Sequence, residues 1–274
     1  MSQERVKRSE FAVEMNCNDC VQLVRKTLDN TAGISAFQID LEQQTVVIEG
    51  SLPPSQLYEA LAKSGKRVQL RAQGGVNGAN LGAAVALLHS RLTGVMGVVR
   101  FTQTSENICS IDATIDGMKP GDHGIHVHTY GDISGDGVNS GPHFNPSDSG
   151  HGKSDGSDRH FGDLGNITAN EFGRGVLHCD DPKLKVWDII GRSVCVDVLR
   201  DSYESKNDGS RDKHLACGVV ARSAGIFQNT KRICQCDGRT LWSEDTSQVA
   251  WANEAANVER SQMSANQPKT TSPL

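Results

Sequence analysis

Residues 121–166 read GDHGIHVHTYGDISGDGVNSGPHFNPSDSGHGKSDGSDRHFGDLGN. This stretch contains six of the nine histidines of the chain. From Tyr130 to Asn166 it shows almost no strand pattern, and glycine, aspartate and serine fill the spaces between the histidines. Because a loop of this length is uncommon inside a compact domain, we expect it to be functional, disordered or pinned by a bound metal.

The histidine spacing predicts a zinc site. His126 and His128 are two residues apart on a predicted strand, so both rings should face the same side. Three more imidazoles and one carboxylate follow along the loop, and such a set completes a tetrahedral zinc site. The predicted zinc ligands are His143, His151, His160 and Asp163. Chance histidines in a polar loop are the alternative, and the tight cluster argues against it. The other histidines fall outside this pattern, with His123 expected at the surface and ordinary roles expected for His89, His178 and His214.

The sequence around the loop predicts an all-β domain. From Leu81 to about Ala221, short strand-like segments alternate with loops rich in glycine, aspartate and serine, which is typical of a Greek-key barrel or sandwich. The predicted strands span 85–88, 97–101, 109–115, 124–128, 175–177 and 192–198.

Residues 9–71 predict a separate α+β unit. Strand patterns at 11–15, 34–40, 45–49 and 68–70 alternate with two helical patterns, which begin near Cys20 and at Pro53–Pro54. The order βαββαβ is the ferredoxin-like arrangement. A Gly/Asn-rich segment at 73–80 follows and is expected to be a linker.

A Cys-x-x-Cys motif at Cys17 and Cys20 lies where the first strand of this unit meets its first helix. Free N–H groups at a helix start stabilise a thiolate, and two soft thiolates suit Cu(I). A thioredoxin-like redox pair and half of a zinc site are the alternatives. The thioredoxin alternative conflicts with the βαββαβ order, and the zinc alternative would need a second Cys-x-x-Cys that the sequence lacks.

Cys234 and Cys236 form a second pair, near the C-terminus. They could bind Cu(I) or exchange with the disulfide of a partner, whereas the plain alternative is two exposed surface thiols. A bond between residues so close together is geometrically disfavoured. Beyond Trp242 the composition predicts a disordered tail. We expect the cysteines on apolar strand patterns to be core residues: Cys109, Cys179 and Cys195.

The overall composition narrows the class of protein. A net charge of −5 argues against nucleic acid as the main partner. The charged N-terminus does not resemble a signal peptide, and no apolar run approaches membrane-spanning length. We therefore expect a cytoplasmic protein, in which eight cysteines serve as ligands or redox groups more often than as a disulfide framework.

Residues 81–221 resemble the Cu,Zn superoxide dismutases. The resemblance rests on GIHVH at 124–128, GD at 131–132, GPHFNP at 141–146, HG at 151–152, RHFGDLGN at 159–166, GR at 191–192 and LACG at 215–218. With the flanking Cys-x-x-Cys and Cys-x-Cys motifs, the whole chain is similar to the family of copper chaperones for superoxide dismutase. The resemblance implies three regions: 1–75, a heavy-metal-associated Cu(I)-binding domain; 76–222, a dismutase-like domain with the zinc site; and 223–274, a Cys-x-Cys segment.

Against the dismutase pattern the chain departs at three positions. Asp197 stands where the resemblance implies a fourth copper-ligand histidine, and His214 stands where it implies the active-site arginine. A carboxylate is a poor ligand for copper that cycles between oxidation states, so we expect a metallochaperone without dismutase turnover. His126, His128 and Asp197 would be the remnant of the copper site. Gly137 replaces the cysteine that would bond to Cys217, so we expect Cys217 to be a free thiol.

The resemblance implies that the protein delivers Cu(I) to a Cu,Zn superoxide dismutase and promotes oxidation of its disulfide within a transient heterodimer. Cys17 and Cys20 would acquire copper, and Cys234 and Cys236 would transfer copper and disulfide to the target. Segments 190–192 and 217–220 match the dimer face, so a homodimer is also expected to form. The family suggests a mitochondrial intermembrane-space pool beside the cytoplasmic one. An active dismutase with an appended metal-loading domain, or a zinc-stabilised metal-buffering scaffold, are the alternatives.

Overall fold

The computed structural model describes residues 6–75, 80–203 and 213–228. Cys234, Cys236 and the segment beyond Trp242 lie outside the described residues, so the predictions made for them are untested by the structure.

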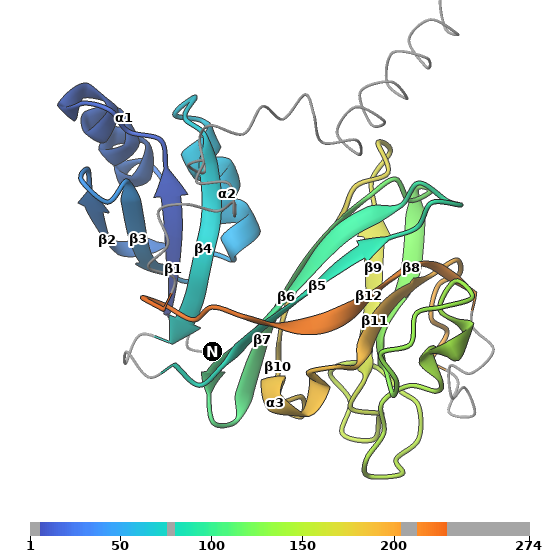
Figure 1. Ribbon diagram of the computed structural model, residues 1–274. Coiled ribbons are helices and arrows are strands. Elements are labelled where there is room, and N and C mark those ends of the chain that lie inside the picture. Colours follow the sequence, from blue (N-terminus) through green and yellow to red (C-terminus); the bar gives the residue numbers. More distant parts are fainter. Residues whose placement is uncertain (1–5, 76–79, 204–212, 229–274) are drawn as a thin grey trace, which may run out of the picture. The chain divides into compact units, whose positions relative to one another are not determined.

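The N-terminal part is a four-stranded antiparallel sheet with two helices (Figure 1). Its elements are β1 (Lys7–Val13), α1 (Asn18–Asp29), β2 (Ile34–Asp40), β3 (Thr45–Gly50), α2 (Pro54–Ala62) and β4 (Val68–Gly75). The strands are ordered β2-β3-β1-β4. The predicted ferredoxin-like βαββαβ arrangement is therefore confirmed.

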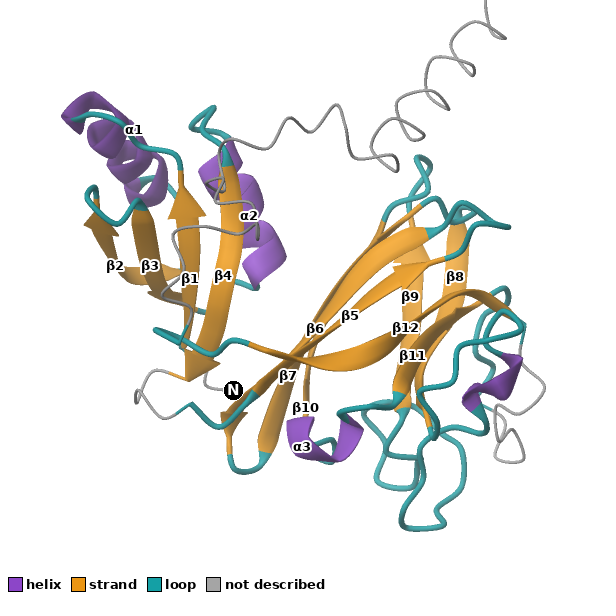
Figure 2. Cartoon of the chain, in the orientation of Figure 1, coloured by secondary structure: helices purple, strands orange, loops and turns teal. Residues whose placement is uncertain are grey.

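Apolar spacing explains this module. In α1 the buried positions Cys20, Val24 and Leu28 are four residues apart, so they form one stripe along the helix. They pack with Leu57 and Leu61 of α2 against the sheet in a single apolar cluster. Both helices therefore cover the same face of the sheet, as Figure 2 shows.

The second part is a closed antiparallel barrel of eight strands in the order β10-β7-β6-β5-β12-β11-β8-β9. These strands are β5 (Ala83–His89), β6 (Met96–Ser105), β7 (Ile108–Asp116), β8 (Gly121–His128), β9 (Asp163–Ala169), β10 (Gly175–Asp181), β11 (Ser193–Asp197) and β12 (His214–Ser223). Two short helical turns accompany them, η1 (Val138–Ser140) and α3 (Val186–Ile189). The predicted all-β barrel is confirmed. Sequence analysis did not anticipate β9, β12 or α3.

Strand β8 positions the histidine cluster. It pairs with β9 on one side and β11 on the other, and its last residue, His128, forms an isolated bridge to His143 in the long loop. The loop closes at Gly162, whose N–H donates to the carbonyl of Phe144 (2.8 Å) and whose carbonyl accepts the N–H of Val127 (2.9 Å). A Cβ on Gly162 would collide with the carbonyl oxygen of Val127, so glycine is the residue that closes the loop here without strain.

Among the described helices, none is long and apolar enough to cross a bilayer.

Candidate metal centre

The buried carboxylate of Asp163, the first residue of β9, is the centre of the histidine cluster. Its Oδ2 accepts the backbone N–H groups of Gly152 (3.1 Å) and His160 (2.9 Å). Its Oδ1 lies 3.0 Å from Nδ1 of His143, 3.0 Å from Nδ1 of His151 and 3.2 Å from Nδ1 of His160. The structure thus brings all four predicted zinc ligands together around one oxygen.

This arrangement fits zinc. Tetrahedral zinc with bonds of about 2.0–2.1 Å places its ligand atoms about 3.3 Å apart, close to the spacing around Asp163. The Nδ1 atoms of His151 and His160 are buried without a hydrogen-bond partner, and a metal would satisfy both. Burial raises the pKa of Asp163, but the surrounding imidazoles lower it by more, so the carboxylate stays ionised as a ligand must.

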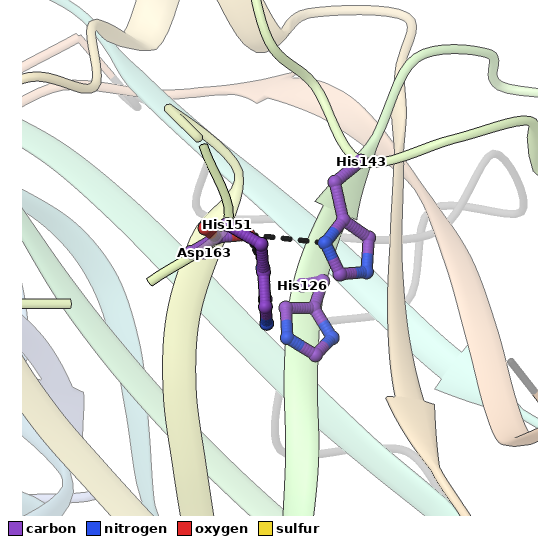
Figure 3. A group of neighbouring side chains, drawn as sticks. All are labelled: His126, His143, His151 and Asp163. Atoms are coloured by element: carbon purple, nitrogen blue, oxygen red, sulfur yellow. Dashed lines mark hydrogen bonds and ion pairs between the residues drawn. The ribbon is translucent and has the colours of Figure 1, made fainter. Parts of the chain in front are cut away.

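His126 also enters the cluster. Figure 3 shows His126 beside His143, His151 and Asp163. One potential ligand atom of each of these four residues lies within 4.8 Å of the others. The rings of His126 and His143 stack with centroids 3.9 Å apart. However, His126 has both nitrogens bound, Nδ1 to Oδ2 of Asp197 (2.8 Å) and Nε2 to Oδ2 of Asp201 (3.0 Å). His160 therefore fits the fourth ligand position better than His126 does.

Asp201 is a functional residue that sequence analysis missed. Its Oδ1 accepts from Nε2 of His151 (2.8 Å), while its Oδ2 contacts His126, so one carboxylate links the two imidazoles. Backbone contacts with Asn166 and Tyr203 hold it in place. No spacing rule singles out an aspartate after β11, and only the fold places it beside the loop.

Three aspartates, Asp163, Asp197 and Asp201, set the pKa values of His126 and His151. Burial alone would lower the pKa of His126, but the hydrogen bonds to Asp197 and Asp201 outweigh it and raise the pKa to about 10. Burial would lower the pKa of His151 too, but its close contacts with the carboxylates of Asp163 and Asp201 outweigh burial and raise the pKa to about 9. Below these values the metal-free cluster carries protons that a cation would have to displace.

Asp197, at the implied copper-ligand position, joins two histidines. Its Oδ2 contacts His126, and its Oδ1 accepts from Nδ1 of His214 (2.8 Å). The interpretation of His214 as an ordinary histidine is therefore wrong, because it belongs to this buried network. His123 is also not a surface residue: it is 5 % exposed, and its ring contacts the carbonyls of Asp197 and Lys119.

Cys17 and Cys20 lie at the start of α1, with Cys17 at the N-cap. Their sulfurs are 3.2 Å apart, Cys17 is exposed, and Cys20 is 9 % exposed. Hydrogen bonding to the backbone of Asn16, and then to Cys17 and Lys66, lowers the pKa of Cys20 to about 7. Two sulfurs this close, one of them partly ionised at neutral pH, form a ready pair of ligands for a soft cation.

Two family models match the chain. The heavy-metal-associated domain matches residues 10–67, and copper/zinc superoxide dismutase matches residues 95–220. The copper chaperone for superoxide dismutase of Rattus norvegicus is 46% identical over 247 residues, which covers 88% of this chain and 90% of the relative. The Homo sapiens protein of the same name is 45% identical with the same coverage. The superoxide dismutase 1 copper chaperone of Saccharomyces cerevisiae is 29% identical over 88% of this chain and 94% of the relative.

The chain belongs to the family of copper chaperones for superoxide dismutase. The named relatives are copper chaperones and not dismutases, which agrees with the metallochaperone predicted from Asp197 and His214. The heavy-metal-associated module supports copper binding in this family member.

A disulfide in the barrel shows that the prediction for Cys217 is wrong. Cys217 is not a free thiol, because it forms a disulfide with Cys195. The two residues are directly opposite on β12 and β11, with Cα atoms 4.2 Å apart. The predicted free thiol follows from the absence of a loop cysteine at Gly137, and the predicted core position of Cys195 follows from its apolar strand. Cys109 is buried in the barrel core as expected, and Cys179 packs against that core.

Proposed function

We propose that this protein delivers Cu(I) to a Cu,Zn superoxide dismutase. The observation that supports this most is the Cys17–Cys20 pair, with sulfurs 3.2 Å apart and a Cys20 pKa of about 7, on a heavy-metal-associated module. Copper is the cargo in this proposal. The thiolates bind it and hand it on, since two soft ligands hold Cu(I) and leave room for an incoming third ligand.

The dismutase-like barrel recognises the target and does not turn over superoxide. Asp197 hydrogen-bonds to His126, so this histidine has no free nitrogen for copper while both contacts to carboxylates last. Zn(II) would be held by His143, His151, His160 and Asp163, where it would order the loop without taking part in transfer.

Recognition would use the surface of the barrel formed by residues 190–192 and 217–220. Gly191 donates its N–H to the carbonyl of Val220 (2.9 Å), and Val220 donates its N–H to the carbonyl of Arg192 (2.8 Å). Val219, which precedes Val220 on β12, is 40% exposed. This surface would pair with the equivalent face of the target in a transient heterodimer, or with a second copy in a homodimer. Cys234 and Cys236 would then transfer copper and promote target disulfide oxidation. The cytoplasm, with an intermembrane-space pool, is the proposed location.

The proposal is tested by activating a target. Copper-loaded protein is mixed with copper-free, disulfide-reduced dismutase, and dismutase activity and target disulfide formation are followed over time. We expect both to rise, and we expect the copper-loaded protein alone to show no dismutase activity. Absence of target activation would refute delivery, and turnover by the protein alone would favour the active-dismutase alternative.

Cysteine variants separate the acquisition of copper from the oxidation of the target disulfide. Cys17→Ser with Cys20→Ser should abolish activation at limiting copper, whereas Cys179→Ser, a cysteine of the barrel wall, should leave it unchanged. Cys234→Ser with Cys236→Ser should lower target disulfide formation. If this last variant activates the target fully, the proposed role of the C-terminal pair is wrong and the metal-buffering scaffold alternative gains support.

A further inference from the structure

A second group of potential metal ligands lies beside the predicted zinc cluster. One donor atom each from His128, Cys195 and His214 lie within 4.8 Å of one another. The rings of His128 and His214 have centroids 4.9 Å apart and are nearly perpendicular. Cys195 and His128 are fully buried, and the His214 side chain is 3% exposed.

Strand register brings these residues together. Cys195 on β11 pairs with His126 on β8 and with Cys217 on β12. Residues paired across neighbouring strands present their side chains on the same face of a sheet, and His128 shares that face with His126. His214 enters at the start of β12, opposite Asp197. The group therefore unites three strands that are far apart in the sequence.

Within the described residues, His128 and His214 each form a hydrogen bond through the Nδ1 atom of the ring. The Nδ1 of His128 donates to the carbonyl of Gly141 (2.8 Å), and its buried Nε2 has no hydrogen-bond partner. The Nδ1 of His214 donates to Oδ1 of Asp197 (2.8 Å). In each ring the proton on Nδ1 leaves the lone pair on Nε2, and a carboxylate or carbonyl behind Nδ1 is the usual support of a metal-binding imidazole.

The sulfur of Cys195 is the component under redox control. It is bonded to Cys217 in the disulfide, so it has no thiolate to offer in that state. Gly137 lies over this bond: a Cβ there would come within 2.5 Å of the Cys217 sulfur and 2.7 Å of the His214 ring. A small pocket of about 60 Å³ is lined by residues that include Asp136, His214 and Cys217, and it offers a thiol an approach to the Cys217 side of the disulfide.

We propose that His128, Cys195 and His214 form a Cu(I) site that opens when the Cys195–Cys217 disulfide is reduced. Two imidazoles and one thiolate are a ligand set that copper favours. This site is separate from the delivery pathway through Cys17 and Cys20, and its test does not depend on target activation.

The redox step is ordinary thiol–disulfide exchange with a small thiol as reductant. The thiolate of the reductant attacks the sulfur of Cys217, the Cys195–Cys217 bond breaks, and Cys195 leaves as a thiolate. A second thiol attacks the mixed disulfide, which yields Cys217 as a thiol and the oxidised form of the reductant. Two thiols thus supply two electrons. The Cys195 thiolate then binds the metal in place of a proton.

The test uses the full chain with Cys17, Cys20, Cys234 and Cys236 all changed to serine, loaded first with zinc. Co²⁺ is the spectroscopic probe, because a cobalt–thiolate bond gives a charge-transfer band that an imidazole and carboxylate site cannot give. In this background we expect no band while the disulfide is intact. A band should appear after reduction by a dithiol that is then removed, and without any reductant in Cys217→Ser. The same samples should bind one further equivalent of Cu(I).

Matched variants identify the ligands. In the Cys217→Ser background, Cys195→Ser should abolish the band, His214→Ala should weaken metal binding by about tenfold or more, and Cys179→Ser should change nothing. The proposal is overturned if neither the reduced chain nor Cys217→Ser shows the band. It is equally overturned if the band survives Cys195→Ser. Retained zinc in each variant reports that the barrel is folded.

Discussion

At the residue scale, two residues that depart from the dismutase pattern, Asp197 and His214, are hydrogen-bonded to each other in a buried network. Asp197 stands at the position where the dismutase pattern has a histidine, and it hydrogen-bonds to both His126 and His214. The histidine in the implied arginine position therefore has a partner in the carboxylate of the implied copper position. The two departures act together, since each buried polar group satisfies the other.

The Cys20 thiol gives a prediction at this scale. Its pKa is lowered to about 7 by hydrogen bonds from the backbone of Asn16, from Cys17 and from Lys66. In metal-free protein the alkylation rate of Cys20 should therefore rise with pH to a half-maximum near pH 7, because only the thiolate reacts. Lys66→Ala should move the midpoint upward, towards the value of an ordinary thiol. Lys63→Ala, at the end of α2, is the control. A Lys66→Ala midpoint equal to that of the parent would contradict the assignment.

At the scale of elements, the long connection between β8 and β9 is held at a few points. Backbone hydrogen bonds join Val127 and Gly162, near its two ends, to each other and to Phe144. The carboxylate of Asp163 contacts three histidines that follow one another along the loop. Buried Arg159 supports the same region, donating to the carbonyl of His160 (3.0 Å) and to Asp181 (2.6 Å). Metal binding at Asp163 would therefore stabilise a segment with few regular backbone hydrogen bonds.

Zinc binding should depend on pH in a defined direction. The pKa of His151 is raised to about 9 in the metal-free cluster, so this residue holds a proton at neutral pH that zinc must displace. Zinc affinity should therefore increase as the pH rises towards about 9, with protons released on binding. A competition titration with a chelator across this range measures the effect, and His160→Ala should lose the zinc. A flat affinity profile would contradict the protonated state of His151.

The closure of the loop makes a second prediction for this element. Gly162→Ala should lower the free energy of unfolding by about 1–3 kcal/mol, since the added methyl group collides with the carbonyl of Val127. Gly150→Ala is the matched control in the same loop. The nearest atom to a Cβ at Gly150 is 3.4 Å away, so its effect should stay within about 0.5 kcal/mol. Denaturant unfolding of zinc-free protein measures both, and equal effects would show that the collision is relieved at little cost.

At the scale of the whole molecule, the N-terminal module and the barrel each have their own apolar core, and the two cores share no residue. One contains Phe11, Leu28 and Ile48 of the N-terminal module, and the other contains Phe101 and Ile125 of the barrel. The apolar core of each part thus comes from its own stretch of the sequence, and the predicted boundaries at 75 and 222 can be tested directly.

A fragment of residues 1–75 should fold and bind one Cu(I), because its core needs no residue of the barrel. Cys17→Ser in this fragment should greatly weaken copper binding, while Ser9→Ala should not. A fragment of residues 76–222 should bind zinc. Circular dichroism and metal analysis check both fragments, and a 1–75 fragment without regular structure would show that the predicted boundary is wrong.

Much of the fold was predictable because its signals are local. The βαββαβ order follows from apolar spacing and helix-ending glycine within each short segment, and the strands of the barrel wall follow from alternation. Strand β9 escaped prediction because Asp163, Gly165 and Asn166 interrupt its apolar pattern. Strand β12 was also not predicted. It begins with the polar residue His214, and its place between β5 and β11 is set by pairing with strands distant in the sequence.

The sequence by itself determined the cysteine pair of the first module, the four residues around the predicted zinc position and the departures at Asp197 and His214, since motif spacing encodes them. Only the tertiary structure decided that Asp201 links His126 to His151, that His214 belongs to the network, and that Cys195 bonds to Cys217. These contacts join β8, β11 and β12 with the loops that follow β8 and β11. They depend on strand register and on how the loops pack against the whole barrel, and neither leaves a local pattern in the chain.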